Sequence, residues 1–253
     1  MSFNIEADAY DRFMGRYSIP LAPLFLEFAR VDWDQQVLDV GCGPGALTAE
    51  LVDRLGTEGV SAVDPSGRFV AAIRDRHPMV EVKQAAAEEL PFEDGSFDAT
   101  LAQLVVHFMA DPVAGLREMA RVTKPKGVVS ACVWDHASGG GPLSTFWDAA
   151  RRLDPDIADE SSLAGARQGH LRELFEEAGL GEVEEGSLVV EIQHPSFEDW
   201  WEPYLLGVGP AGAFVATLDP AQKTQLRDLC EEMLPPAPFV VSARAWVARG
   251  RAT

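Results

Sequence analysis

The chain has 253 residues, enough for one large α/β domain with an inserted segment and too few for two full-sized domains. Hydrophobic residues make up 47% of it, so a substantial core can form. The 40 acidic residues outnumber the 21 basic ones and give a formal net charge of −19. This balance disfavours nucleic acid as a partner, because nucleic-acid binding depends on basic contacts to phosphates.

Three features of the chain bear on its compartment. No apolar run reaches the ~18 residues that a membrane-spanning helix requires. The N-terminus lacks the basic start and apolar stretch of a secretory signal. The cysteines Cys42, Cys132 and Cys230 have the spacing of neither a disulfide framework nor a metal site. We therefore expect a cytoplasmic protein with no membrane span and no bound metal.

The chain begins with residues 1–30, which we expect to form a helical lid. An aromatic and basic cluster from Tyr10 to Tyr17 precedes Pro20, and the apolar stretch LAPLFLEFA that follows is typical of a helix.

Residues 36–135 alternate between strand and helix patterns. The run QVLDV is short and apolar and leads into a glycine loop, as a buried parallel strand does. The expected strands are 36–40, 60–64, 80–86, 96–106 and 126–135, and the expected helices are 46–56, 66–77 and 113–122. Strands separated by helix-length segments pair in parallel through right-handed crossovers, which predicts a doubly wound α/β domain.

The alternation breaks after the fifth strand. A helix is expected at 169–180, and strands are expected at 182–193 and 239–250. Residues 195–236, between these two strands, are rich in Trp, Gly and Pro and are predicted to form a helical cap. An insertion of this size beside strand ends usually serves a binding site. Trp200, Trp201 and Tyr204 are candidates either for lining an apolar acceptor pocket or for packing inside the cap.

The most informative segment is VLDVGCGPGALT (37–48). Its glycines stand where a strand leads into a helix, and glycine permits both a tight turn and the close approach of a ligand. The segment fits the dinucleotide-binding pattern G-x-G-x-x-G/A, and Asp64 follows near the position of the usual ribose-binding acid. These features alone leave open a nicotinamide dinucleotide or S-adenosylmethionine as the ligand, because both carry an adenosine ribose.

Asp39 helps to distinguish the two ligands. It stands at the end of the strand, two residues before Gly41. A carboxylate at this place would repel the pyrophosphate of a dinucleotide, whereas it would attract the ammonium and sulfonium of S-adenosylmethionine. A cap for the loop or helix is the alternative role of Asp39.

Four stretches resemble successive motifs of a known enzyme family: VLDVGCGPGALT, AVDPSGRFV, AAEELPFEDGSFDATLAQ and REMARVTKPKG. They are similar to class I S-adenosylmethionine-dependent methyltransferases, and most to the type 11 branch that resembles ubiquinone and menaquinone biosynthesis methyltransferases. The resemblance is strong over residues 36–135 and architectural in the flanks. It implies S-adenosylmethionine as the cofactor and a seven-stranded sheet of order 3-2-1-4-5-7-6 with strand 7 antiparallel.

The resemblance also implies which residues contact the cofactor. At the methionine end it places Asp39, Gly41, Cys42, Gly43, Gly45 and Gln103. Around the adenosine it places Asp64, Pro65, Ser66, Ala86, Ala87, Glu88 and Leu90. Asp64 would bind the ribose, and the N–H of Ala87 would bind adenine. The family usually has an aspartate where this chain has Ala86, which puts one hydrogen bond to the adenine amino group in doubt.

Further candidates flank this set. His107 and His136 follow the fourth and fifth strands, where open α/β sheets bind ligands, so either is a candidate general base or simply a packed or solvated histidine. In the N-terminal segment, Arg16 is a candidate partner for the methionine carboxylate and Tyr10 for the sulfonium. A helix that only packs on the domain is the alternative for both.

The predicted function is methyl transfer to a small, fairly apolar or aromatic molecule. Such an in-line displacement depends mainly on positioning, and a general base is needed only if the acceptor must lose a proton. One alternative is an NAD(P)-dependent oxidoreductase, although the chain lacks a Tyr-x-x-x-Lys pair. The other is a non-catalytic cofactor-binding module, an alternative suggested by the missing adenine-binding aspartate at Ala86. The oligomeric state is left open.

Overall fold

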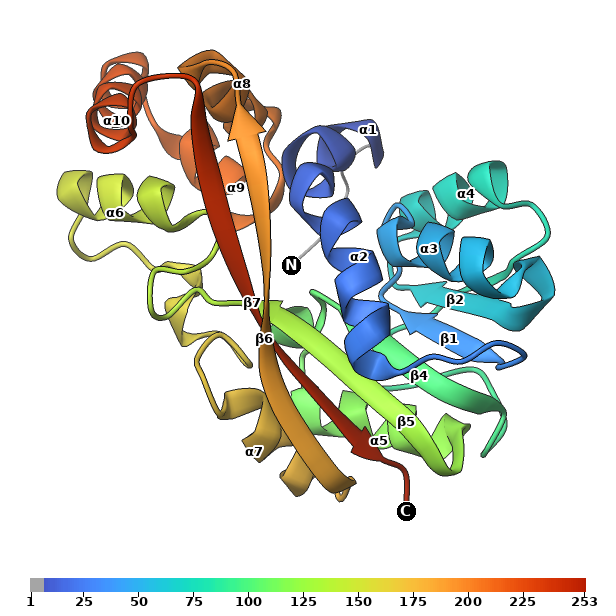
Figure 1. Ribbon diagram of the computed structural model, residues 1–253. Coiled ribbons are helices and arrows are strands. Elements are labelled where there is room, and N and C mark those ends of the chain that lie inside the picture. Colours follow the sequence, from blue (N-terminus) through green and yellow to red (C-terminus); the bar gives the residue numbers. More distant parts are fainter. Residues whose placement is uncertain (1–6) are drawn as a thin grey trace.

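The computed structural model describes residues 7–253, which form one seven-stranded sheet with helices on both sides (Figure 1). The strands are β1 (Val37–Val40), β2 (Val60–Asp64), β3 (Glu81–Gln84), β4 (Phe97–Gln103), β5 (Thr123–Trp134), β6 (Gly181–His194) and β7 (Phe239–Arg251). Their order is β3-β2-β1-β4-β5-β7-β6. β1 to β5 pair in parallel, and β7 is antiparallel to β5 and β6. The predicted fold class and strand order are confirmed.

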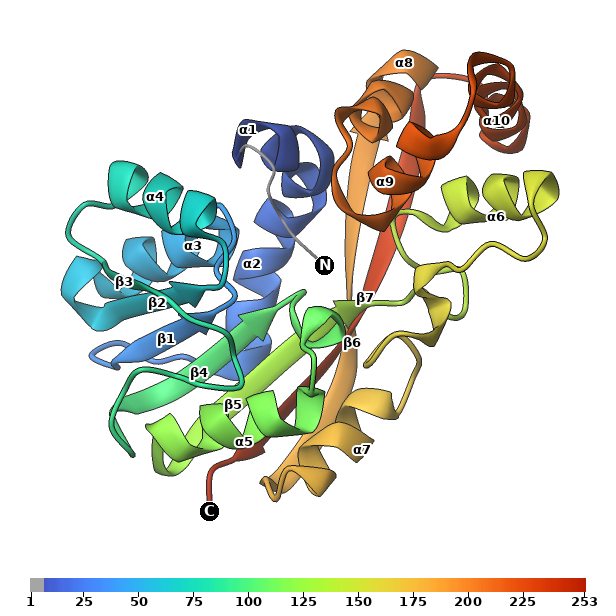
Figure 2. The ribbon, with the colours of Figure 1, turned by 180° about the vertical axis from the view of Figure 1, so that it is seen from behind.

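Two layers of helices cover the sheet (Figures 1 and 2). One layer contains α2 (Arg16–Ala29), α3 (Ala46–Leu55) and α4 (Gly67–Arg76), and the other contains α5 (Pro112–Val122) and α7 (His170–Glu177). Because both faces are covered, β1 and β2 are buried at every position, which explains why their sequences are continuous apolar runs and not alternating ones.

Local signals set several of the helix ends. α3 stops at Leu55 because Gly56 takes a positive φ of 76°, which glycine adopts at little cost. α5 begins at Pro112, and the side chain of Asp111 caps it by accepting a hydrogen bond from the N–H of Ala114. These signals are readable in the sequence, and the predicted bounds of both helices lie within one residue of the observed ones.

The helical cap is inserted between β6 and β7, as predicted. It contains α8 (Phe197–Trp201), the 3₁₀ segment η5 (Glu202–Leu206), α9 (Gly209–Thr217) and α10 (Pro220–Met233). In Figure 1 the ends of β6 and β7 rise beyond the rest of the sheet and carry these helices. The amphipathic helix α6 (Ser144–Leu153), which follows β5, packs against α10 and completes the same lobe.

The N-terminal segment differs from the sequence expectation. Its first six residues lie outside the described part of the chain. From Ala7 the backbone is continuously helical, through α1 (Ala7–Tyr10), a π-helical turn η1 (Asp11–Gly15) and α2. We expected the helix to begin after Pro20, but Pro20 and Pro23 lie inside α2. Each lacks an N–H, so one helical hydrogen bond is lost at each proline. Burial of Leu21, Ala22, Phe25 and Leu26 against the sheet offsets that loss.

Three further 3₁₀ turns lie in connections: η2 (Thr57–Gly59), η3 (Val106–Phe108) and η4 (Glu160–Ser162). Within residues 7–253, none of the helices combines the length and the apolar character that crossing a membrane would take.

The layer formed by α5 and α7 makes a testable contribution to stability. Phe175 on α7 is fully buried in it, whereas Val189 on β6 is 47% exposed. We expect Phe175→Ala to lower the free energy of unfolding by about 3–5 kcal/mol through lost burial and a residual cavity. Val189→Ala should change it by less than about 0.5 kcal/mol, since surface substitutions are usually near neutral. Chemical denaturation followed by circular dichroism measures both, and equal losses would contradict the two-layer packing.

Candidate cofactor and acceptor site

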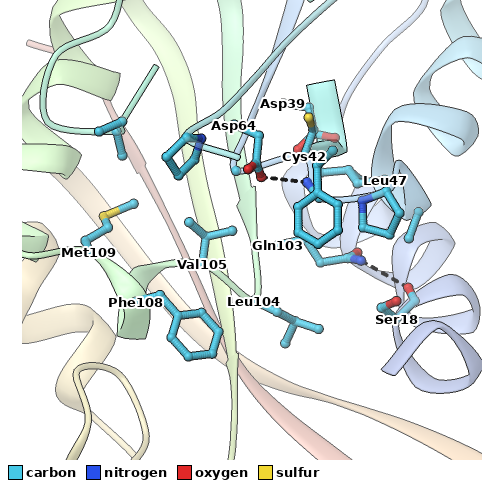
Figure 3. A pocket seen from close by; sticks show the side chains of 18 of the residues that line it. Ser18, Asp39, Cys42, Leu47, Asp64, Gln103, Leu104, Val105, Phe108 and Met109 are labelled. Carbon is cyan, nitrogen blue, oxygen red and sulfur yellow. Dashed lines mark hydrogen bonds between the residues drawn. The ribbon is translucent and has the colours of Figure 1, made fainter. Parts of the chain in front are cut away.

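A cavity of about 260 Å³ opens at the carboxyl ends of β1, β2 and β4 (Figure 3). The strand order reverses here, because β2 and β3 extend from one side of β1 whereas β4 and β5 extend from the other. Open α/β sheets bind ligands at this kind of switch point, where the connections on either side of it diverge and leave a crevice. The cavity is therefore the candidate cofactor site.

The loop after β1 forms one wall of the cavity. Gly41 and Gly45 have φ values of 71° and 107°, and a Cβ on either would come within 2.5 Å of the side chain of Val105 or Ile73 respectively. A Cβ on Gly43 would meet no protein atom within 4 Å, so the bare backbone there faces open space. Gly41 and Gly45 are required by the turn and by close packing, whereas the absence of a side chain at Gly43 leaves room for a ligand.

Asp64 joins this loop to the next one. The carboxylate is 6% exposed and accepts a hydrogen bond from the N–H of Gly43 at 2.9 Å (Figure 3). It accepts another from the N–H of Ser66 at 2.7 Å. Burial raises its pKa, and the two hydrogen bonds partly offset that shift. Each oxygen keeps a second lone pair, so the group can still accept from ribose hydroxyls.

Asp39 lies deeper in the same cavity. The Oδ2 atom accepts a hydrogen bond from the hydroxyl of Thr48 at 2.7 Å. Burial raises the pKa of Asp39 to about 7, and the hydrogen bond from Thr48 opposes this shift. Burial thus favours the protonated form of Asp39 in the free protein, and a cation in the cavity would favour its ionised form.

Two further oxygens at this end have no partner. Gln103, at the end of β4, donates from Nε2 to the carbonyl of Ser18 on α2 at 3.0 Å, and the two residues lie side by side in Figure 3. Oε1 of Gln103 and Oγ of Ser18 are buried without a hydrogen-bond partner, and both residues line the cavity. Buried oxygens of this kind cost free energy unless a ligand supplies donors. Together with Asp39 they make this end suitable for an ammonium group.

The opposite end of the cavity is more apolar. Ala86 and Ala87 line it after β3, with Phe69 and Met109 also in the wall. The carboxylate of Glu88 accepts hydrogen bonds from the N–H groups of Ala110 and Asp111, and so ties the loop after β3 to the start of α5. A flat apolar group such as adenine fits this environment. The side chain of Ala86 provides no hydrogen bond.

A second, smaller cavity of about 40 Å³ adjoins the first. Tyr10, Leu104 and Phe108 line both. Its other walls come from the N-terminal helices, the end of β5, η4 and the start of α9 beneath the cap, and are contributed by Phe13, Met14, His107, Trp134, His136, Leu143, Glu160, Val208, Gly209, Pro210 and Ala211. A small molecule held there would lie next to the reacting end of a ligand in the first cavity.

The titratable residues of the second cavity are strongly affected by burial. Burial, together with the neighbouring His136, lowers the pKa of His107 far below its usual value. Burial lowers the pKa of His136 to about 4. Burial raises the pKa of Glu160 to about 7, and a hydrogen bond from the indole N–H of Trp147 opposes that shift. Both imidazoles are therefore neutral at neutral pH and keep a lone pair.

The structure brings most of the predicted cofactor residues to the first cavity. They are Tyr10, Asp39, Gly41, Cys42, Gly43, Asp64, Pro65, Ala86, Ala87, Glu88 and Gln103. Four of the predicted residues are not among those that line it, and one of them, Leu90, is buried in the core layer of α5 and α7. Gly45 packs against Ile73, and the N–H of Ser66 donates a hydrogen bond to the carboxylate of Asp64. The guanidinium of Arg16 contacts Asp199 at 2.9 Å and His194 at 3.1 Å, so it is held by the cap and not by the cofactor cavity.

The second cavity also differs from expectation. His107 and His136 line it, whereas Trp200, Trp201 and Tyr204 do not. These three aromatic residues are buried within the cap, where Tyr204 stacks on Phe146 with ring centroids 4.5 Å apart. Glu160 also lines this cavity but is not among the predicted residues, because it lies between α6 and α7 and no sequence motif surrounds it.

Comparison with known proteins extends the description of this site. Residues 38–131 match the type 11 family model that describes a methyltransferase domain. An uncharacterized methyltransferase of Mycobacterium tuberculosis is 36% identical over 135 residues, which are 53% of this chain and 52% of the relative. A demethylmenaquinone methyltransferase of Renibacterium salmoninarum is 33% identical over 128 residues, 51% of this chain and 53% of the relative. The chain thus spans about half the length of the curated relatives it matches.

Solved structures are similar over nearly the whole chain. The complex between the Haloferax volcanii Trm112 methyltransferase activator and a methyltransferase contains a chain that matches with a TM-score of 0.62 and 22% identity, covering 97% of this chain and 94% of that one. A Bacillus halodurans protein assigned as a methyltransferase matches with a TM-score of 0.59 and 18% identity, covering 91% and 98%. At these identities the likeness bears on the fold alone. Residues 38–131 are therefore similar to the type 11 methyltransferase domain, and nearly the whole chain has the fold of these solved methyltransferase structures.

Proposed function

We propose that the protein transfers a methyl group from S-adenosylmethionine to a small, largely apolar or aromatic molecule held beneath the cap. One observation carries this proposal. The first cavity offers a buried carboxylate and two unpartnered oxygens at one end, from Asp39, Gln103 and Ser18, and a ribose-binding carboxylate, Asp64, farther along. This is the charge pattern that a donor with a cationic amino-acid end and an adenosine requires.

The chemistry then depends on position. Bound S-adenosylmethionine supplies a methyl group on a sulfonium, which leaves as a neutral thioether when an acceptor lone pair attacks the methyl carbon. The part of the protein is to align the two ligands, and alignment of reactants contributes on the order of 7–11 kcal/mol. Tyr10, Leu104 and Phe108 stand between the two cavities and can exclude water from the reacting atoms.

The lining of the second cavity supports the acceptor class. Most of its residues are apolar or aromatic, with His107, His136 and Glu160 as the ionisable exceptions. An acceptor with an apolar body and one polar reactive end fits such walls. His107 and His136 remain the candidates for contact with the reactive hydroxyl of an acceptor: each neutral imidazole can accept a hydrogen bond from it, although their lowered pKa values make both weak general bases.

The contacts of the glycine loop weigh against a dinucleotide. The N–H groups of residues 41–45 all donate within the chain, apart from Pro44, which has none. A pyrophosphate would therefore find no free donors on the loop itself. No lysine or arginine lines the first cavity among the described residues. A non-catalytic binding module would share the cofactor site, so an activity assay separates it from the proposed enzyme.

Removing the charge of Asp64 tests the cofactor. We expect Asp64→Asn to weaken binding of S-adenosylhomocysteine by roughly 10-fold to 150-fold, because hydrogen bonds to charged groups contribute about 1.5–3 kcal/mol. Asp53→Asn, at an exposed position on α3, should leave the affinity unchanged. Isothermal titration calorimetry with S-adenosylhomocysteine and with NADH measures both. Binding of NADH alone by the wild-type protein would rule out the proposal.

Asp39 predicts a pH dependence of donor binding. Its pKa is about 7 in the free protein, so acidification below that value protonates the carboxylate and removes its attraction for a cation. Affinity for S-adenosylmethionine should fall with decreasing pH by up to about tenfold per pH unit. Asp39→Asn should bind S-adenosylmethionine weakly, and its affinity should stay constant between about pH 5.5 and 8. An unchanged slope in this variant would show that another group titrates.

Filling the second cavity tests the acceptor site. Ala211 on α9 lines this cavity and is fully buried, whereas Ala213 on the same helix is exposed. We expect Ala211→Leu to reduce methylation of any accepted compound in a panel of phenols, quinones and carboxylic acids by at least about tenfold. Ala213→Leu should have no effect, and both variants should keep wild-type affinity for S-adenosylhomocysteine. Mass spectrometry of the products is the measurement, and full activity of Ala211→Leu would place the acceptor elsewhere.

A further inference from the structure

Three potential metal ligands meet in the second cavity. His107 comes from η3 after β4, His136 follows the end of β5, and Glu160 begins η4. One ligand atom from each residue lies within 4.8 Å of the other two. The three residues are far apart in the sequence, so the fold alone brings them together. The earlier expectation of no bound metal rested on cysteine spacing, and this cluster contains no cysteine.

The polar atoms of this cluster are poorly satisfied by the protein. Nδ1 of His107 and Nε2 of His136 are buried and have no hydrogen-bond partner. The two imidazole rings face the same small space, with centroids 5.7 Å apart. A buried polar atom without a partner costs about 1–3 kcal/mol, and two such atoms beside a carboxylate indicate a missing ligand. A ligand that accepts electron pairs from all three residues would remove this cost.

Glu160 is already oriented for such a role. Its Oε2 atom accepts a hydrogen bond from the indole N–H of Trp147 at 3.0 Å, and the residue is 4% exposed. Trp147 lies on α6, which packs against α10 of the cap. This hydrogen bond leaves Oε1 for a second interaction. Metal-binding carboxylates are commonly held by an outer partner of this kind, which fixes their orientation.

We propose that His107, His136 and Glu160 bind a divalent first-row transition metal ion, such as Zn²⁺, within the second cavity. Two imidazole nitrogens and one carboxylate oxygen are a ligand set that such ions favour, and they leave an open position. Bonds of about 2.0–2.1 Å to a tetrahedral ion put its ligands roughly 3.4 Å apart. The observed spacing of up to 4.8 Å therefore needs only a small inward rotation of the side chains.

The location suggests which acceptors the site would take. The ion would lie in the cavity that adjoins the donor site across Tyr10, Leu104 and Phe108. A divalent ion lowers the pKa of a hydroxyl that it contacts, and it fixes the position of the oxygen. This role of the ion rests on the proposed function. An ion at this position would select acceptors with a phenol, enol or carboxylate oxygen at the reactive end. A hydroxyl proton would leave to solvent when the oxygen binds the ion, before the donor is in place, so that the oxygen anion then attacks the methyl carbon and the sulfonium leaves as a neutral thioether.

Metal binding can be measured without any cofactor. The full chain, freed of any polyhistidine tag and treated with a chelator, is titrated with Co²⁺ while its visible absorption is recorded, and with Zn²⁺ by calorimetry. We expect one ion per chain with the absorption of a Co²⁺ site that has nitrogen ligands. Glu160→Gln keeps the size of the side chain and an acceptor for Trp147, and should weaken binding at least about tenfold, as should His136→Ala. His77→Ala, a histidine outside the cluster, should bind as the wild type does.

Two results would overturn the proposal. One is a wild-type protein that binds no ion above the buffer blank, which is expected if a water molecule satisfies the three residues. The other is equal metal affinity in the wild type, Glu160→Gln and His136→Ala. Circular dichroism and the affinity for S-adenosylhomocysteine show whether the variants fold and keep the donor site. Metal binding without S-adenosylhomocysteine binding would refute the proposed function and leave the metal site standing.

Discussion

The arrangement of the site depends on the hydrogen bonds that Asp64 accepts. One carboxylate, buried at the end of β2, holds the N–H of Gly43 in the loop after β1 and the N–H of Ser66 at the start of α4. Two loops from neighbouring strands are thereby fixed against each other, while the bare backbone at Gly43 faces the cavity. A ligand that meets this carboxylate finds it already oriented, so little conformational entropy is lost on binding. Asp64 thereby uses the N–H of Gly43, and the remaining N–H groups of the loop donate to main-chain carbonyls, so none is left for a pyrophosphate.

Charge then distinguishes the two ends of the cavity. The protein carries a strong negative net charge, yet the acidic and polar groups that would contact a cation in the cavity are few and buried. Asp39 lies in low dielectric surroundings, where its interaction with a cation is stronger than at the surface. Gln103 and Ser18 add unpartnered oxygens at the same end, and the hydrogen bond between them fixes α2 against β4. The cost of burying these groups without partners is recovered only when a cationic ligand enters.

Much of this could be predicted from the sequence, because the donor site is built from strand ends and from loops only a few residues long. β1 and the glycine loop are continuous in the chain, Asp64 ends the next strand, and their mutual geometry follows from the parallel pairing of β1 with β2. The rest depends on contacts between distant segments. Arg16 carries a charge suited to a carboxylate ligand, but its partner Asp199 lies 183 residues away on the cap. Glu160 belongs to an irregular stretch, where no periodic pattern marks its burial against Trp147.

The N-terminal helices connect the two cavities with the cap. Ser18 faces the donor cavity, while the preceding residues face the opposite way: the hydroxyl of Tyr17 lies 3.1 Å from Nε2 of His194, and Arg16 is ion-paired with Asp199. Tyr10, earlier in the same continuous helical segment, lines both cavities. A helix tied to the cap on one side and to β4 on the other cannot leave one cavity without disturbing the other. The walls of the donor and acceptor cavities therefore share one helical segment that is held by the cap, and this segment helps to exclude water from both.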